Sequence, residues 1–339
     1  MTGAPGGGAT LVRAVLPTIC QFHWRFVRMA DISVIIPTKN AGGIFGDVLA
    51  GLRGQTFSGG LEIVVVDSGS TDQTLELARQ YGCIVHKIDP AEFDHGATRD
   101  RAIGFANAPV VILMTQDAVP ANENLVQALH ACFHDQRVAG AYARQIPRTQ
   151  ADVLTTRNVN NHLTGRGALV VQEVPEPGAL ARLPPLERYV ACNFDNVCSA
   201  VRRSAWENTR FGKCDFGEDL VWAKRVLEAG WKILYEPSAA VIHSHDRSLR
   251  YEYQRTYMCH RKLFELFEVA TVPAARYVPR CLLAAVVQDS VYVIKNESRF
   301  RQRLRLLLRI PAMSVASVFG QYRGARDQRL ARGRKHAGV

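Results

Sequence analysis

The strongest constraint on the fold is a set of short apolar runs that alternate with helical patterns. Runs at 31–37, 61–67, 84–88 and 110–115 are rich in Val, Ile and Leu, as buried strands are. Between them, apolar residues recur at helical spacing, as in the segment 68–82. Strands separated by helices in this way predict an α/β fold with a mostly parallel, doubly wound sheet. Ligands of such sheets bind beyond the carboxyl ends of the strands.

Local sequence signals mark where one helix begins and where regular structure stops. Ser70 is expected to N-cap the second helix, with Gln73 three residues later and Gly82 at its end. Residues 144–190 are rich in Gly, Pro and polar residues and have little periodicity. We expect a long, mobile excursion there.

Two acids stand at predicted strand ends. Asp67 is either an ordinary turn acid near a helix start or a carboxylate that accepts hydrogen bonds from a nucleotide base or ribose. Asp117 is either part of a plain strand-to-turn transition or a ligand of Mg²⁺ or Mn²⁺. Such a metal would neutralise a diphosphate leaving group.

A second pair of acids opens a predicted helix at residues 218–230. Asp215 and Glu218 have the spacing of a capping box, so Glu218 has a structural explanation. Asp219 points elsewhere on the first turn, and a partly desolvated carboxylate there could accept a proton from an acceptor hydroxyl.

Basic side chains accompany these acids. Arg99 starts a helix, and His95 and Gly96 before it suggest a close approach of the backbone to a ligand. His243 and His245 end a late strand and, being two residues apart, point the same way, toward metal or phosphate. The alternative for His245 is a satisfied polar residue at a strand end.

The chain carries a formal net charge of +11 over 339 residues, and thirteen Lys or Arg against three Asp or Glu lie in the last sixty positions. The basic segment 299–310 is typical of an amphipathic helix that lies on anionic lipid. A spanning helix is disfavoured because one apolar stretch of the region contains Asp289 and the next contains Arg309 and Pro311. Nucleic-acid binding is disfavoured because no recognised module accompanies the arginines. A merely solvated tail is the remaining alternative. The eight scattered cysteines predict reduced thiols in the cytoplasm.

Five segments together resemble one family: "SVIIPTKN", "VVVDSGSTDQT", "GATRDRA", "LMTQDAVP" and "FGEDLVWAKRVLEAGWKILYEPSAAVIHSH". Their order and spacing are similar to those of glycosyltransferase family 2, whose members are inverting, nucleotide-sugar-dependent enzymes of the GT-A fold. Within it the segments look most like the bacterial rhamnosyltransferases that use dTDP-L-rhamnose. The resemblance covers a GT-A domain at 31–257. Composition predicts a flexible leader before it, at 1–30, and a basic, helical, membrane-associating region after it, at 258–339.

The resemblance also implies roles for single residues. Asp219 would be the catalytic base with Glu218 beside it, and a divalent metal, Mg²⁺ or Mn²⁺, would bind Asp117 and His243. The implied nucleotide contacts are Pro37, Thr38, Asp67, Arg99 and Gln116, and the implied donor or acceptor sugar contacts are His95, Asn196, Trp222 and His245.

Three departures from the family pattern qualify these roles. Ser68 replaces the second acid of the usual "DDGS", Thr115 replaces the first acid of the metal motif, and the QxxRW motif of processive members is absent. We therefore expect transfer of one or a few L-rhamnose units to a hydroxyl of a lipid-linked envelope glycan, at the inner face of the cytoplasmic membrane. The alternatives are another UDP, GDP or dTDP sugar, or an inactive nucleotide-sugar-binding scaffold.

Overall fold

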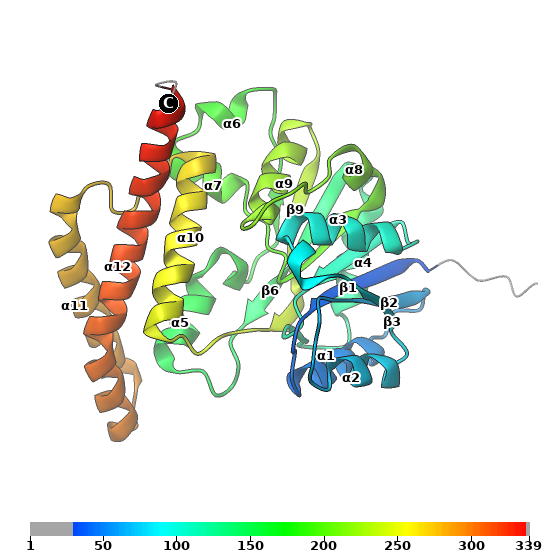
Figure 1. Cartoon of the computed structure of the whole chain (residues 1–339), viewed down its shortest axis with the longest axis horizontal. Coiled ribbons are helices and arrows are strands. Elements are labelled where there is room, and N and C mark those ends of the chain that lie inside the picture. The colour runs from blue at the N-terminus through cyan, green and yellow to red at the C-terminus, as the bar shows by residue number, and fades with distance from the viewer. Residues whose placement is uncertain (1–29, 337–339) are drawn as a thin grey trace, which may run out of the picture.

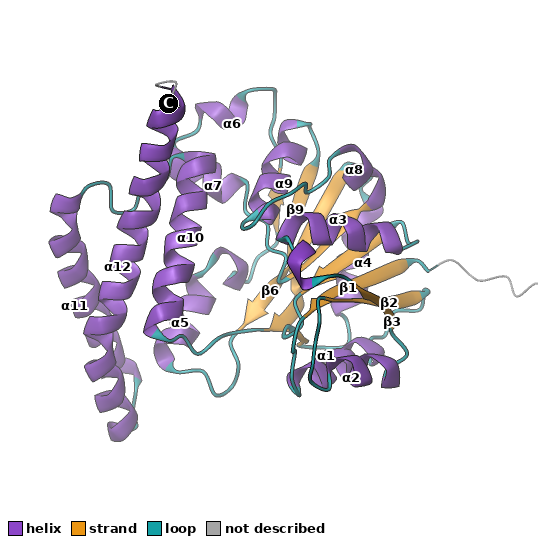
Figure 2. Ribbon diagram, viewed as in Figure 1, coloured by secondary structure: helices purple, strands orange, loops and turns teal. Residues whose placement is uncertain are grey.

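The predicted apolar runs form one half of a single sheet (Figures 1 and 2). In the computed structural model, which describes residues 30–336, this half has the strand order β3-β2-β1-β4 and all its strands are parallel. Its members are β1 (Ile32–Thr38), β2 (Leu61–Asp67), β3 (Ile84–Lys87) and β4 (Val110–Met114). The predicted leader lies, up to residue 29, outside the described residues.

The other half of the sheet is mixed. β8 joins antiparallel to β4, then β6, β9 and β5 follow in that order, and β7 pairs with β9. β6 and β9 are parallel to each other. The bounds are β5 (Val119–Pro120), β6 (Val138–Ile146), β7 (Val170–Gln172), β8 (Cys198–Arg202) and β9 (Lys232–Ile242). The α/β fold class is confirmed, with antiparallel strands added at one side.

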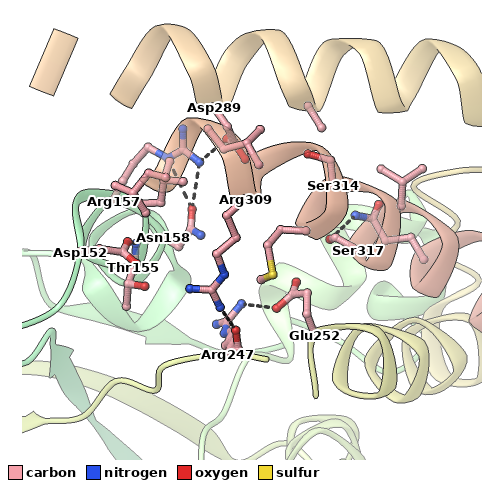
Figure 3. Close-up of a pocket in the computed structure, with 17 residues that line it drawn as sticks. Asp152, Thr155, Arg157, Asn158, Arg247, Glu252, Asp289, Arg309, Ser314 and Ser317 are labelled. Carbon is pink, nitrogen blue, oxygen red and sulfur yellow. Dashed lines mark hydrogen bonds and ion pairs between the residues drawn. The ribbon is translucent and has the colours of Figure 1, made fainter. Parts of the chain in front are cut away.

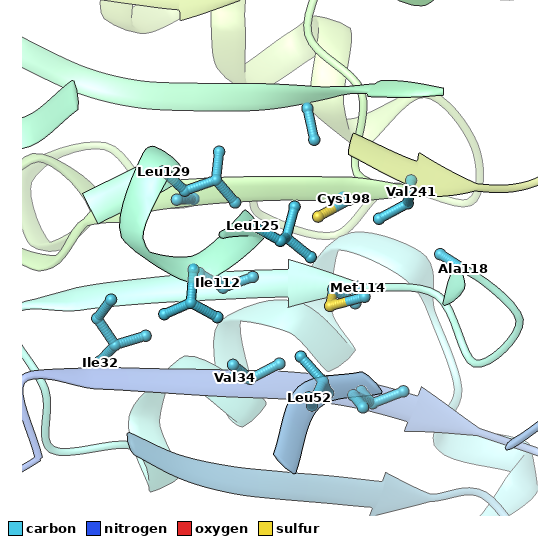
Figure 4. Close-up of a cluster of buried hydrophobic side chains, with 14 of the residues drawn as sticks. Ile32, Val34, Leu52, Ile112, Met114, Ala118, Leu125, Leu129, Cys198 and Val241 are labelled. Carbon is cyan, nitrogen blue, oxygen red and sulfur yellow. The ribbon is translucent and has the colours of Figure 1, made fainter. Parts of the chain in front are cut away.

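Two hydrophobic cores cover the two faces of the sheet because side chains alternate along each strand. On one face Ile32 and Val34 pack with Leu52 of α1 (Ile44–Arg53) and Leu125 of α4 (Leu125–Ala131), as Figure 4 shows. On the other face Ile35 joins a core that lies beneath three further helices. These are α3 (His95–Phe105), α8 (Arg203–Asn208) and α9 (Glu218–Glu228).

Two predicted helix caps are wrong. The helix α2 (Thr74–Gln80) begins after Gln73, and the Ser70 hydroxyl instead donates to Asp67. Asp215 does not cap α9, whose N-cap is Gly217 in the left-handed region at φ 69°. The end of α2 is as expected, since Gly82 has φ 64°.

The segment 144–190 is not the mobile excursion that its composition suggests. It carries α5 (Val153–Asn161), β7, α6 (Ala179–Arg182) and α7 (Pro185–Ala191). The strand β7 belongs to the sheet, and the three helices lie between the sheet and the C-terminal helices (Figure 1). Polar composition misled here because the segment packs against partners that are distant in sequence.

The C-terminal region consists of α10 (Leu249–Phe267), α11 (Val278–Asn296) and the long α12 (Phe300–His336), which lie side by side (Figure 1). The predicted domain boundary at residue 257 falls inside α10. A Cβ atom at Gly324 of α12 would clash with the carbonyl oxygen of Tyr257 on α10, so glycine is what lets these two helices touch.

Candidate active site

The carboxyl ends of β1 and β2 form the first wall of the site, where Thr38 and Asp67 are register partners. The Asp67 carboxylate accepts from the Thr38 hydroxyl at 3.0 Å and from the backbone N–H groups of Gly69 and Ser70 at 3.0 and 2.9 Å. The Ser70 hydroxyl donates to it at 2.5 Å. Asp67 is 1% exposed. In this geometry Asp67 shapes the loop 68–71, as the turn-acid interpretation predicts, and a base contact would have to replace one of its four bonds.

Gln116 and Asn40 tie the neighbouring loops together. The Gln116 amide accepts from the Lys39 backbone N–H at 2.8 Å and donates to the Lys39 carbonyl at 3.3 Å. Asn40, at φ 48°, accepts from the Thr71 backbone N–H at 2.8 Å. Pro37 is half-buried in the same wall. The family resemblance implied a nucleotide contact for Gln116, whereas here its side chain binds the Lys39 backbone. These bonds hold the loop that leads to Asp117.

Asp117 meets both late histidines at the centre of the site. The Asp117 Oδ2 atom lies 3.6 Å from His243 Nε2 and 3.7 Å from His245 Nε2, and the three ligand atoms fall within 4.8 Å of one another. The short pairing of β5 with β9, Val119 against Ile242, brings the two loops together. His245, which the resemblance gave to a sugar subsite, thus stands with the predicted metal ligands.

A hydrogen-bond chain fixes the tautomer of His243. Gln145 Nε2 donates to Asp195 Oδ2 at 2.9 Å, so the Gln145 amide oxygen must face His243 Nδ1, which lies 3.0 Å away. Since that oxygen only accepts, Nδ1 carries the proton and Nε2 turns its lone pair toward Asp117. Burial lowers the pKa of His243 to about 4, so the ring is neutral at pH 7.

A lone pair that faces a carboxylate is what a cation site provides. The donor set of one carboxylate and two imidazoles therefore fits a divalent metal that accepts nitrogen as well as oxygen. Arg148 adds a positive charge at its edge: its guanidinium lies 3.6 Å from Asp117 Oδ2 and donates to the Asp117 carbonyl at 3.2 Å. The Thr115 hydroxyl, at the position of the missing first acid, is buried and has no hydrogen-bond partner within residues 30–336.

Asp219 lies half-buried in the first turn of α9. Burial, together with the negative charges of Glu218 and Asp195, raises the pKa of its carboxyl well above the usual value. Its carboxylate accepts from the Leu220 backbone N–H at 2.8 Å, and the Asn196 backbone N–H lies 3.5 Å from the other oxygen. A raised pKa on a partly accessible carboxylate suits a general base that works near neutral pH.

Glu218 and Arg99 form a buried ion pair next to Asp219. Arg99 Nη1 lies 2.9 Å from Glu218 Oε1, and both side chains are less than a tenth exposed. Asn196 donates to the same oxygen at 3.0 Å and accepts from the Ser199 hydroxyl at 2.7 Å. These contacts join α3 to α9 and β8. In this structure, therefore, Arg99 and Asn196 both bind the carboxylate of Glu218.

Two predicted sugar contacts, Trp222 and His95, have opposite surroundings. Trp222 is fully buried, stacks on Phe211 at 5.3 Å and donates to the Thr209 carbonyl at 2.7 Å, a position that argues against a sugar contact. His95 is exposed at the start of α3. The close approach at Gly96 is to the protein itself, since a Cβ atom there would clash with the carbonyl oxygen of Gly212.

The sequence reasoning missed four polar residues that organise the site. Gln145 and Arg148 lie at and just beyond the end of β6, and Asp195 precedes β8. Asp100 on α3 accepts from the backbone N–H groups of Phe211 and Gly212 at 3.0 and 2.8 Å, which fixes the loop before α9. Only Asp195, between two asparagines in "CNFDN", had a local signal.

Comparison with known proteins identifies the family. The family model "Glycosyl transferase family 2" matches residues 33–215. The chain belongs to glycosyl transferase family 2. It is therefore a nucleotide-sugar-dependent glycosyltransferase. The match includes Asp67, Arg99 and Asp117, whereas Asp219 and the two histidines lie beyond it.

Two curated relatives are similar over two thirds of the chain. The O-antigen chain rhamnosyltransferase RfbN of Salmonella typhimurium is 32% identical over 228 residues, which are 66% of this chain and 69% of the relative. The O-antigen chain rhamnosyltransferase WbaN of Salmonella anatum is 31% identical over 231 residues, 67% and 70% of the two chains.

A solved structure supports the fold. The mannosyltransferase PcManGT from Pyrobaculum calidifontis, determined with GDP-Man and Mn²⁺, aligns with a TM-score of 0.52 at 16% identity and covers 86% of this chain and 88% of its own. At that identity the likeness shows the GT-A fold that the sequence predicts.

Proposed function

We propose that this enzyme transfers L-rhamnose from dTDP-L-rhamnose to a hydroxyl group of a lipid-linked O-antigen-type glycan. The observation that carries the donor assignment is its similarity, at 31–32% identity, to two O-antigen chain rhamnosyltransferases. The acceptor follows from the same similarity and from the basic C-terminal region, which would keep the enzyme at the inner face of the cytoplasmic membrane.

The chemistry is a single displacement at the anomeric carbon. Asp219 removes the proton of the acceptor hydroxyl, whose oxygen bonds to that carbon as the bond to the diphosphate breaks, so that dTDP leaves with the electron pair. The raised pKa of the Asp219 carboxyl keeps its proton affinity high enough for this step. Glu218 is unsuited to the same task because its charge is balanced by Arg99 at 2.9 Å.

Asp117, His243 and His245 would hold a divalent cation that neutralises the departing diphosphate. Because two of the three donors are imidazoles, we propose Mn²⁺ over Mg²⁺, which prefers oxygen ligands. The Arg148 guanidinium, 3.6 Å from Asp117 Oδ2, would add a second positive charge that stabilises the leaving diphosphate.

A donor panel tests the proposal. Purified enzyme with Mn²⁺ is given dTDP-L-rhamnose, dTDP-glucose, UDP-glucose and GDP-mannose, and release of nucleoside diphosphate is measured with and without a lipid-linked acceptor. We expect release from dTDP-L-rhamnose alone. Faster turnover of another donor would replace the rhamnose assignment, and binding without turnover of any donor would favour the inactive scaffold.

Matched variants test the residue roles in the same assay. Asp219→Asn should lower turnover by a factor of about 10²–10⁴, the usual contribution of a general base. Asp215→Asn is the control because Asp215 is an exposed acid four residues away. Equal turnover by the two variants would remove Asp219 from the mechanism.

A further inference from the structure

Two neighbouring helices expose an unusual amount of apolar side chain. On α11 and on the first turns of α12 these residues recur every three or four positions, so each set lies along one face of its helix. We call them the apolar face: Leu283 (68% exposed), Val287 (52%), Val291 (45%), Ile294 (54%), Phe300 (74%), Leu304 (48%) and Leu308 (75%). Figure 1 shows α11 as the outermost helix of the protein.

A row of arginines borders the apolar face. Arg301, Arg305 and Arg309 each follow one of Phe300, Leu304 and Leu308, and these six side chains line a shallow groove on α12. The acids of the region are turned inward. Asp289 pairs with Arg157, and Glu297 is 3% exposed and pairs with Arg299. The surface that α11 and the start of α12 offer to solvent is therefore apolar and cationic.

The helix α11 is held against the protein at its middle. Residues 275–296 are long and apolar enough to cross a membrane by length and composition alone. However, Asp289 pairs with Arg157 of α5 at 2.6 Å (Figure 3). The same guanidinium lies over the Tyr292 ring, 4.7 Å from its centroid. A spanning α11 would have to break this pair and leave Asp289 in hydrocarbon.

The second half of α12 packs against the rest of the protein. Gly320 and Gly324 bring it into backbone contact with α10, and Arg332 pairs with Glu268. Among the described residues, the part of the C-terminal region left for a partner is therefore α11 together with the first turns of α12. The sequence pattern pointed to the basic segment 299–310 alone, so the structure adds α11 to it.

We propose that an anionic lipid bilayer covers the apolar face, with α11 and the first turns of α12 lying in the headgroup region and Arg301 and Arg305 contacting lipid phosphates. A second copy of the chain fits less well, because self-association would bring two cationic borders together, whereas anionic lipids complement them. This surface deepens the proposed function: it would hold the enzyme where a lipid-linked acceptor is presented.

Vesicle flotation tests the surface with the full chain. Wild-type protein is mixed with vesicles of phosphatidylcholine containing phosphatidylglycerol, or of phosphatidylcholine alone, at two salt concentrations. We expect binding to the anionic vesicles that weakens with salt. The double variants Leu304→Glu/Leu308→Glu and Arg301→Glu/Arg305→Glu should each reduce binding by roughly tenfold or more.

Leu330→Glu is the matched control, since Leu330 is 52% exposed on the second half of the same helix. It should bind as wild type does. Equal binding by the Leu304→Glu/Leu308→Glu variant would overturn the proposal, as would a wild-type dimer in light scattering that this variant dissociates. Hydrolysis of dTDP-L-rhamnose in solution should be unchanged in that variant, so loss of vesicle binding and failure of the donor assignment give different results.

Discussion

The side-chain oxygen of Gln145 lies 3.0 Å from Nδ1 of His243 and thereby decides which nitrogen of that imidazole faces Asp117. The direction of the Gln145 amide is itself set by Asp195, which can only accept. A residue on β6 thus fixes which lone pair His243, just after β9, turns toward Asp117.

Gln145→Leu should weaken Mn²⁺ binding by about 10–100-fold, the usual effect of removing a group that orients a metal-ligating histidine. The leucine cannot accept from Nδ1, so the ring loses its fixed tautomer. Mn²⁺ affinity measured by electron paramagnetic resonance checks this, with Gln80→Leu as the control because Gln80 is exposed on α2. Unchanged affinity would mean that the Asp195–Gln145–His243 chain does not orient a ligand.

Removal of metal should stop sugar transfer. We expect EDTA to abolish turnover and Mn²⁺ to restore it better than Mg²⁺, because two of the three donors are imidazoles. Asp117→Ala should lower turnover by about 100-fold or more even with excess Mn²⁺, since the metal contributes several kcal/mol at the leaving group. Activity that survives EDTA unchanged would remove Asp117 from a metal site.

The pH dependence of turnover should report Asp219. The carboxyl must be unprotonated to accept a proton, and its pKa lies well above the usual value because of burial and the charges of Glu218 and Asp195. With saturating Mn²⁺, kcat/KM should therefore keep rising with pH well beyond the range where an ordinary carboxyl has titrated, about pH 4. A profile that is flat from about pH 5 upward would contradict the assignment.

Asp219→Asn should stabilise the fold near neutral pH. When the pKa of an acid is higher in the folded than in the unfolded protein, the folded state binds more protons between the two values, so stability falls as the pH rises through that window. The asparagine side chain does not titrate, so the variant does not lose stability over this pH range. Denaturant unfolding should show the variant to be more stable at pH 8, and equal to wild type below the unfolded pKa of about 4. No gain at pH 8 would mean that the carboxylate is not destabilised in the fold.

Glu218→Ala should destabilise the protein by about 3–5 kcal/mol, because it leaves the Arg99 guanidinium buried without its partner. The double variant Arg99→Met/Glu218→Leu should recover much of this loss, since apolar residues can replace a buried pair. Denaturant titration measures the free energy of unfolding of each variant. Glu92→Ala is the control because the ion pair of Glu92 with Arg101 is exposed. If the single and double variants lost the same free energy of unfolding, the unpaired Arg99 charge would not be the cause of the destabilisation.

The acids at the strand ends were readable because their positions depend on local pattern. An apolar run that stops at Asp67 or Asp117 predicts both the strand and the edge at which it ends. The sequence pattern also singled out His243 and His245, but its reason was wrong: β9 ends at Ile242, and the two histidines reach Asp117 from the loop that follows it, not from one face of a strand. The prediction for Trp222 was wrong because the sequence pattern of an amphipathic helix is the same whether its tryptophan contacts a ligand or the core. Here the ring packs against Phe194 and Phe211.

By itself, then, the sequence determined the parallel half of the sheet, the family, and the acids and histidines at the edge where ligands bind. Only the tertiary structure decided what each polar side chain contacts: that Glu218 is neutralised by Arg99, that Gln145 orients His243, and that Asp289 holds α11 against α5. The physical reason is separation along the chain. Strand and helix patterns arise within a few residues, whereas these contacts join segments 98 to 132 residues apart, from Gln145–His243 to Arg157–Asp289, and arise only when the sheet and helices have packed.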